Sequence, residues 1–199
     1  MRELNFTGDA PIAAIGPERY ALGDWSTEED SALVFDELVA KSKLWERSFS
    51  EVRGYSLAPR LNRENKDHLR IDRILIPGER LKRAGWTHVV GVELKRSGHM
   101  ANGRFEKEKL GPPLAQAIDY TQCAWNVGIY WMLCEYVFLW PFAKQTGVVE
   151  SIMAQSRVGV AYEAYGDLVF QLERQVIRFE RDGSLQVALP QAGRKTGSR

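Results

Sequence analysis

Short blocks of alternating and periodic apolar positions run along the chain, and they predict a mixed α/β fold. Ser26 or Thr27, followed by three consecutive acids, is typical of a helix start, and we expect this helix to run to about Lys43. Three strand-like segments follow, at 49–59, 69–76 and 87–97. We expect the last two to be neighbours in one sheet.

The second half of the chain predicts further helices and strands. Residues 98–113 hold three glycines and two prolines, which predicts a long basic loop of the kind that covers a binding site. A helix is expected over 114–126. The apolar run 129–140 predicts a central strand, because it is hydrophobic on both faces. A helix at 147–159 and two or three antiparallel strands over 159–189 follow, with a hairpin turn at Asp182-Gly183.

Composition indicates one globular domain, since the 199 residues are 44% hydrophobic and 27% charged. We expect this domain to span 1–190, with an irregular N-terminal arm at 1–25 and a disordered basic tail at 191–199. The start of the chain does not read as a secretory signal, and the run 129–143 is shorter than a membrane helix, so we expect a cytoplasmic protein.

The two cysteines, Cys123 and Cys134, form no CxxC pair, which excludes a disulfide framework, an iron–sulfur cluster and a structural zinc site. The three histidines make no metal-binding motif. No phosphate-binding glycine motif of the nucleotide-dependent enzymes is present, so no nucleotide cofactor is expected. Aromatic residues of the apolar run are expected in the core rather than stacked on bases. These are Tyr130, Trp131, Tyr136, Phe138 and Trp140.

Charge is unevenly distributed, although the chain as a whole carries only +1. Residues 53–109 contain 14 Lys and Arg against 7 Asp and Glu. A polyanionic partner fits such a basic section, while a solvated basic surface is the commoner explanation of charge asymmetry alone. The position of the carboxylates inside this section favours the polyanion.

Alternation along the strand at 87–97 places Glu93 and Lys95 on one face. Asp72 interrupts the apolar strand at 69–76, where a charged carboxylate is costly without a cation. If the two strands pair, Asp72 and Glu93 converge. With the backbone carbonyl of Leu94 they offer hard oxygen ligands suited to Mg²⁺ or Mn²⁺. Lys95 would then act on the attacking water or stabilise charge on a phosphate oxygen.

An acid on one strand, followed by Glu-x-Lys at the end of the next, resembles the pattern of the PD-(D/E)XK nuclease superfamily. Gln116 and Tyr120, on the helix that comes next, resemble the QxxxY element of its RecB-like branch. The resemblance implies a restriction-endonuclease-like fold, a mixed central sheet flanked by helices, here with extra antiparallel strands at the C-terminus. It also implies a divalent-metal-dependent endonuclease that hydrolyses DNA phosphodiester bonds. Gln116 and Tyr120 would position the substrate or Lys95.

The family also presents an acid from its first helix. Glu37 is the candidate, because it shares a helical row with Leu33, Ala40 and Leu44 that we expect to border an inward-facing stripe. Glu51 on the first strand is the rival. The family's proline is absent, since Ile71 precedes Asp72, and so is the four-cysteine cluster of some relatives. Phosphate contacts are expected from basic residues around the motif. These are Arg70, Arg73, Arg96, Arg104, Lys107 and Lys109.

Simpler explanations of the same residues remain open. A surface ion pair would account for Glu93 and Lys95, and ordinary packing would account for Tyr120. A catalytically inert nucleic-acid-binding or protein-interaction module that keeps the fold is therefore the alternative to the nuclease. Homodimerisation or a partner helicase is a further option. The sequence does not distinguish DNA from RNA, or duplex from branched substrates.

Overall fold

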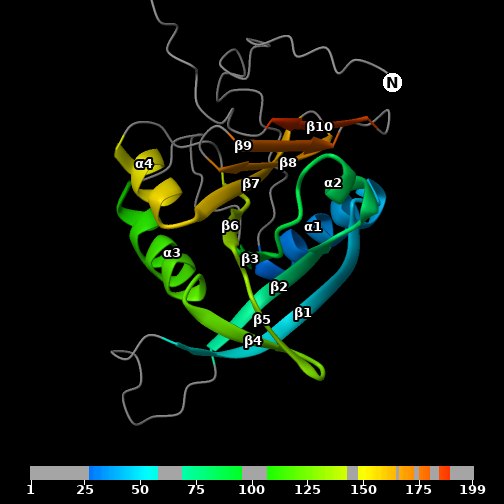
Figure 1. Cartoon of the computed structure of the whole chain (residues 1–199). Helices are drawn as coiled ribbons and strands as arrows, with labels where there is room; N and C mark the ends of the chain where they lie inside the picture. The colour runs from blue at the N-terminus through cyan, green and yellow to red at the C-terminus, as the bar shows by residue number, and fades with distance from the viewer. Residues whose placement is uncertain are drawn as a thin grey trace, which may run out of the picture.

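The computed structural model describes residues 27–57, 69–95, 107–142, 148–164, 166–172, 175–179 and 184–188. The predicted arm at 1–25, the turn at Asp182-Gly183 and the tail at 191–199 lie outside these residues. Within them, four helices and ten strands form an α/β structure (Figure 1). The helices are α1 (Glu28–Ser42), α2 (Glu79–Arg83), α3 (Lys107–Tyr120) and α4 (Val148–Gln155).

The ten strands form one mixed sheet with the order β10-β9-β8-β7-β6-β3-β2-β1-β4-β5. Strand β6 is parallel to both β3 and β7, and the other neighbours are antiparallel. The strands of the first half are β1 (Trp45–Ser56), β2 (Leu69–Pro77), β3 (Val90–Leu94), β4 (Cys123–Val127) and β5 (Tyr130–Leu133). Those of the second half are β6 (Tyr136–Trp140), β7 (Val158–Ala164), β8 (Asp167–Leu172), β9 (Gln175–Phe179) and β10 (Leu185–Ala188).

Two apolar clusters, one on each face of the sheet, hold the layers together. On β3, Val90 and Val92 belong to the cluster that packs under α1 and α2. The opposite cluster packs under α3 and α4, through Ala117, Tyr120 and Met153. The central strands therefore carry apolar side chains on both faces, as expected for strands covered on both sides.

The predicted first helix is confirmed, and Thr27 is its N-cap. The Thr27 hydroxyl oxygen accepts a hydrogen bond from the Asp30 amide at 3.0 Å, and three acids occupy the first turn. The helix ends at Lys43, whose φ of 50° gives a left-handed cap. The predicted pairing of the strands around Asp72 and Glu93 is also confirmed, because β2 and β3 are antiparallel neighbours.

The prediction of one central strand over 129–140 is wrong. A turn at Gly128, with a φ of 79°, folds β5 back on β4, and only β6 is central in the sheet. Strand β5 is the last strand of the sheet as described, and its Tyr130 and Trp131 are exposed rather than in the core. Hydrophobicity alone did not distinguish an exposed hairpin strand from a buried one.

The predicted boundaries of the third helix were also wrong. Residues 107–113 are helical instead of forming the end of a loop, and the helix stops at Tyr120. Residues 98–106 lie outside the described part of the chain. Cys123–Val127 forms β4, which pairs with β1. Pairing with a strand about 70 residues away in sequence overrode the local helical pattern. No helix in the described residues is long and apolar enough to cross a membrane.

Gly54 allows β1 to lie against the large ring of Trp125. A Cβ at this position would come within 2.4 Å of the indole and 2.6 Å of the Ala124 carbonyl oxygen. We therefore expect Gly54→Ala to lower the free energy of unfolding by about 1–3 kcal/mol, through overpacking. Chemical denaturation measures this change. Gly111→Ala, where a Cβ meets no atom within 4 Å, is the control and leaves stability the same or slightly raised. Equal stability of both variants would contradict this packing.

Candidate functional site

The register of β2 and β3 brings the two predicted metal-binding carboxylates together. Arg73 pairs with Val92, and Ile74 pairs with Gly91. One step further along the same antiparallel register, Asp72 lies opposite Glu93. Val92 and Leu94 belong to the cluster under α1 and α2, so Glu93 between them points to the opposite face, which α3 covers. The charges of Glu93 and Asp72 both help to raise the pKa of Tyr120 on that helix.

Glu93 is the buried member of this pair, with 2% of its surface exposed. Its carboxylate forms an ion pair with the Lys95 ammonium, while the second oxygen, Oε2, has no hydrogen-bond partner. Burial, and after it the neighbouring Asp72 charge, raise the pKa of Glu93 from 4.5 to about 7. Near neutral pH this carboxyl therefore exchanges a proton with solution, and a cation bound beside Asp72 would have to displace that proton.

Asp72 is held by the backbone of the neighbouring strand. The amide of Leu94 donates a 2.7 Å hydrogen bond to Asp72 Oδ2. Burial raises the pKa of Asp72, while the Leu94 hydrogen bond and the Lys95 charge oppose that rise. The Leu94 side chain is buried on the opposite face. Its carbonyl stays a predicted ligand.

Lys95 is anchored at the end of β3 by two other elements. Its amide donates to the Trp140 carbonyl of β6 at 2.7 Å, and its own carbonyl accepts from the Ser31 hydroxyl of α1 at 2.8 Å. The side chain keeps 16% exposure. The backbone from which the Lys95 side chain extends is therefore fixed, and the side chain itself is partly open to solvent.

Gln116 and Tyr120 form one connected unit on α3, and their hydrogen bonds lead to the Arg70 carbonyl rather than to Lys95. The Gln116 side-chain amide donates to the Tyr120 hydroxyl at 2.6 Å, and this hydroxyl donates to the Arg70 carbonyl at 2.6 Å. Tyr120 is 3% exposed and its ring packs in the core. It thus combines the packing role with a position beside the carboxylates.

Removal of the Tyr120 hydroxyl tests this connection. Tyr120→Phe keeps the ring but leaves the Arg70 carbonyl without its donor, so we expect the free energy of unfolding to fall by about 1–3 kcal/mol. Urea denaturation at neutral pH measures the change. Tyr130→Phe, at an exposed position of β5, is the control with no expected effect. A stability equal to that of the wild type would show that the hydroxyl is not used.

The predicted helical row around Glu37 does not face inward. The buried residues of α1 are Ser31, Phe35, Val39 and Ser42, so Leu33 and Glu37 point to solvent. Glu37 pairs with Lys41 at 3.7 Å, and both side chains are 71% exposed. The prediction for Glu37 was wrong because α1 packs on the sheet through the neighbouring row of residues, which contains Phe35 and Val39.

Asp36 is the α1 acid that contacts the sheet, and the sequence analysis missed it. It accepts two hydrogen bonds from Arg73, at 2.8 Å and 2.7 Å. Arg73 is only 11% exposed and its pKa is raised by this partner. Arg73 was a predicted phosphate contact, but in the structure its guanidinium binds the Asp36 carboxylate of α1. In the sequence, the signal for Asp36 was its place directly after Phe35, an apolar residue of the helix.

Glu51 lies much nearer to the carboxylate pair than Glu37 does. The β1–β2 register places it opposite Asp72, and its charge contributes to the raised pKa of Asp72. Its φ of 53° makes a local kink in β1. The carboxylate binds the Arg70 guanidinium at 2.6 Å, with both side chains more than half exposed. Of the two predicted alternatives, Glu51 is thus the one beside the cluster.

Only some of the other predicted phosphate contacts lie within the described residues. Arg70 is exposed next to Glu51. Arg96 and Arg104 lie outside the described residues. Lys107 and Lys109 are in α3, but their side chains are not described.

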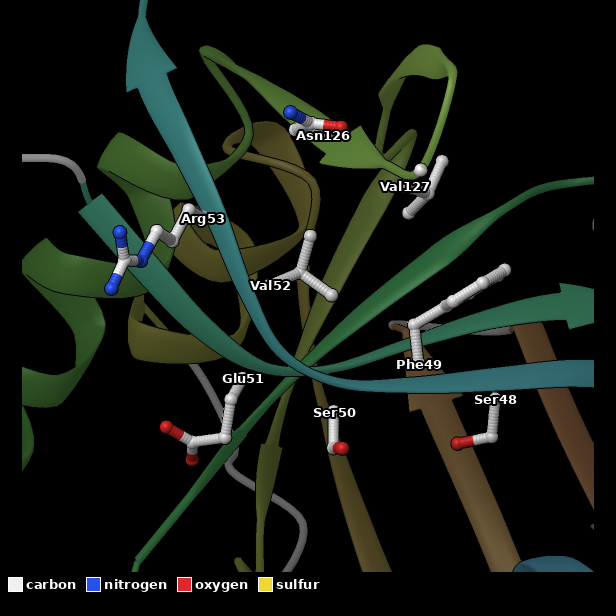
Figure 2. Close-up of a pocket in the computed structure, with 9 residues that line it drawn as sticks. Ser48, Phe49, Ser50, Glu51, Val52, Arg53, Asn126 and Val127 are labelled. Atoms are coloured by element: carbon white, nitrogen blue, oxygen red, sulfur yellow. The ribbon is translucent and has the colours of Figure 1, made fainter.

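An open pocket of about 660 Å³ adjoins Glu51 and runs between β1 and the β4–β5 turn (Figure 2). Across the described ranges, no group of three or more His, Cys, Asp or Glu residues is placed to hold a metal ion.

Comparison with protein-family models, with curated proteins and with solved structures found no match.

Proposed function

We propose that this protein is a divalent-metal-dependent nuclease that hydrolyses DNA phosphodiester bonds, with a PD-(D/E)XK-type site on a restriction-endonuclease-like core. One observation carries the proposal: the buried Glu93 carboxyl lies opposite Asp72 and pairs with Lys95, so two carboxyls and one ammonium meet at one place. A purely structural Glu–Lys ion pair does not require a second carboxylate beside it.

The residues fit a hard divalent cation such as Mg²⁺ or Mn²⁺. Asp72 and Glu93 supply carboxylate oxygens, and the Leu94 carbonyl is the third oxygen of the proposed set. Two adjacent carboxylates in a desolvated place destabilise each other, which is consistent with the raised pKa of Glu93. When bound, the ion would supply Lewis-acid activation of the phosphodiester.

Lys95 is assigned to charge stabilisation. An ammonium that pairs with a carboxylate has only hydrogen-bond donors, so it orients the attacking water and stabilises the charge that develops on a phosphate oxygen. The backbone contacts with Ser31 and Trp140 fix the origin of this side chain.

Gln116 and Tyr120 are assigned to positioning. Their hydrogen-bond chain ends on the Arg70 carbonyl, two residues before Asp72 on the same strand. The exposed Arg70 guanidinium, which pairs with Glu51, is a candidate phosphate contact on the same strand as Asp72. These hydrogen bonds would therefore hold the segment of β2 that carries both Asp72, a proposed metal ligand, and Arg70, a proposed phosphate contact.

The test is a cleavage assay with labelled linear, circular and junction DNA, in Mg²⁺ and in EDTA. Cleavage in Mg²⁺ that stops in EDTA supports the proposal, and cutting of circular DNA identifies an endonuclease. Sedimentation of the protein, with and without DNA, measures whether a homodimer is the acting form. Absence of cleavage in both Mg²⁺ and Mn²⁺ contradicts the proposal as stated for this chain. A requirement for a partner helicase would appear as cleavage restored by that partner.

A further inference from the structure

A row of exposed side chains leads away from the carboxylates along β1. Glu51, Arg53, Tyr55 and Leu57 are exposed, while the residues between them are buried. Figure 2 shows the Glu51 and Arg53 side chains extending to one side of β1, with Val52 directed to the other. Over four residues of a strand, the distance from Glu51 to Tyr55 is about 13 Å.

The row continues across the β4–β5 hairpin. Arg53 lies in register with Asn126, which pairs with Trp131, and Tyr55 pairs with Ala124. The rings of Tyr55 and Trp131 contact each other edge to face, with centroids 4.9 Å apart. We call the surface made by these exposed side chains the Tyr55 face. Its members are Arg53, Tyr55, Asn126 and Trp131.

The aromatic rings of the Tyr55 face are more exposed than core packing requires. Tyr55 is 47% exposed and Trp131 is 54% exposed. The inner face of the same strands is occupied by Trp125, which Gly54 admits and which is fully buried. The β4–β5 hairpin is thus anchored by Trp125 on its inner face. The rings of Tyr55 and Trp131 on the outer face remain exposed and accessible to a ligand.

We propose that the Tyr55 face binds single-stranded nucleic acid by stacking bases on Tyr55 and Trp131. Exposed aromatic rings interleaved with cationic side chains are the general device for this ligand. Arg53 has no acidic partner within ion-pair distance among the described residues, and Asn126 adds hydrogen-bonding groups. The inference rests on the proposed function, because it supplies the substrate class that the carboxylates would cleave.

Charge favours a nucleic acid over a second copy of this chain as the occupant. Arg53 is the cation of this face, whereas Arg70, which is in register with it, is already paired with Glu51. A two-fold contact between copies would bring like charges together. A phosphate backbone neutralises them instead, and it would run from the aromatic rings past Arg53 toward Glu51 and Asp72.

The test measures binding in EDTA, where no cleavage takes place. A labelled oligo-dT of about 15 nucleotides is titrated with each variant and followed by anisotropy. We expect Tyr55→Ala and Trp131→Ala each to weaken single-strand binding by about 5- to 100-fold, and to change duplex binding by less than twofold. Arg53→Gln should lower the salt slope of single-strand binding by about 0.7.

Tyr130→Ala is the matched control, since Tyr130 is an exposed aromatic residue on β5 that pairs with Val127 of the inner face. Binding by the Tyr55 and Trp131 variants within twofold of the wild type overturns the inference, as does an equal loss in Tyr130→Ala. A wild-type dimer in sedimentation that Tyr55→Ala converts to a monomer also overturns it, in favour of a second copy. Circular dichroism confirms that each variant is folded.

The inference and the proposed function fail in different ways. Stacking-dependent binding without Mg²⁺-dependent cleavage would refute the nuclease and keep the Tyr55 face. Cleavage unaffected by both aromatic variants would refute the Tyr55 face and keep the nuclease. An oligo-U arm distinguishes RNA: tighter binding of oligo-U than oligo-dT supports the Tyr55 face and contradicts DNA as the substrate.

Discussion

Lys95→Ala is expected to lower the rate of the proposed Mg²⁺-dependent DNA cleavage by about 100- to 1,000-fold, the size of effect seen when one preorganised charge donor is removed from a phosphoryl-transfer site. The loss falls on the rate at saturating DNA, because exposed arginines rather than Lys95 would account for DNA affinity. Single-turnover cleavage of labelled DNA measures it.

Lys41→Ala is the control for Lys95→Ala. Lys41 also forms an ion pair, with Glu37, but on the exposed surface of α1, away from the carboxylates. Its removal is expected to leave cleavage unchanged. Equal cleavage by the wild type and Lys95→Ala would assign the activity to other residues or to a contaminant.

Glu93→Gln stabilises the metal-free protein at alkaline pH. The folded-state pKa of Glu93 is raised from 4.5 to about 7, so the folded protein holds a proton that the unfolded chain releases between these values. Stability of the wild type therefore falls as the pH rises through this window, by up to about 3 kcal/mol, and stays low above it. Gln mimics the protonated acid and carries no such penalty.

Thermal unfolding in EDTA between pH 5 and pH 8.5 measures this effect. At pH 8.5 the midpoint of Glu93→Gln should exceed that of the wild type by about 4–10 °C, and the two midpoints should converge near pH 5. Glu150→Gln, on α4, is the control and should follow the wild type. A constant difference between Glu93→Gln and the wild type at all pH values would contradict the assignment of the titration to Glu93.

The part of the candidate site that could be predicted from the sequence depends on local rules. Alternation along a strand placed Glu93 and Lys95 on one face, and helical spacing placed Gln116 one turn before Tyr120. That β2 and β3 are neighbours followed from their succession in the chain, because consecutive strands usually lie next to each other in a sheet. Each of these steps uses only residues close in sequence.

What could not be predicted depends on partners distant in sequence. Which α1 acid contacts the sheet was decided by Arg73, 37 residues away from Asp36, and not by the helix's own pattern. The kink at Glu51 is a single left-handed residue in β1, and residue types do not signal it. The division of 129–140 into an exposed and a central strand likewise followed from tertiary pairing.

The central claim is that Asp72 and Glu93 hold one divalent ion, and titration with Mn²⁺ alone, followed by thermal unfolding at pH 7.5, tests it most directly. A ligand that binds only the folded state raises the apparent stability, by about 2.7 kcal/mol at 100 times its dissociation constant. We predict a saturable rise of the unfolding midpoint for the wild type and for Glu150→Gln, and none for Glu93→Gln or Asp72→Asn. The same rise in all four proteins, or no rise in the wild type at millimolar Mn²⁺, would contradict the account.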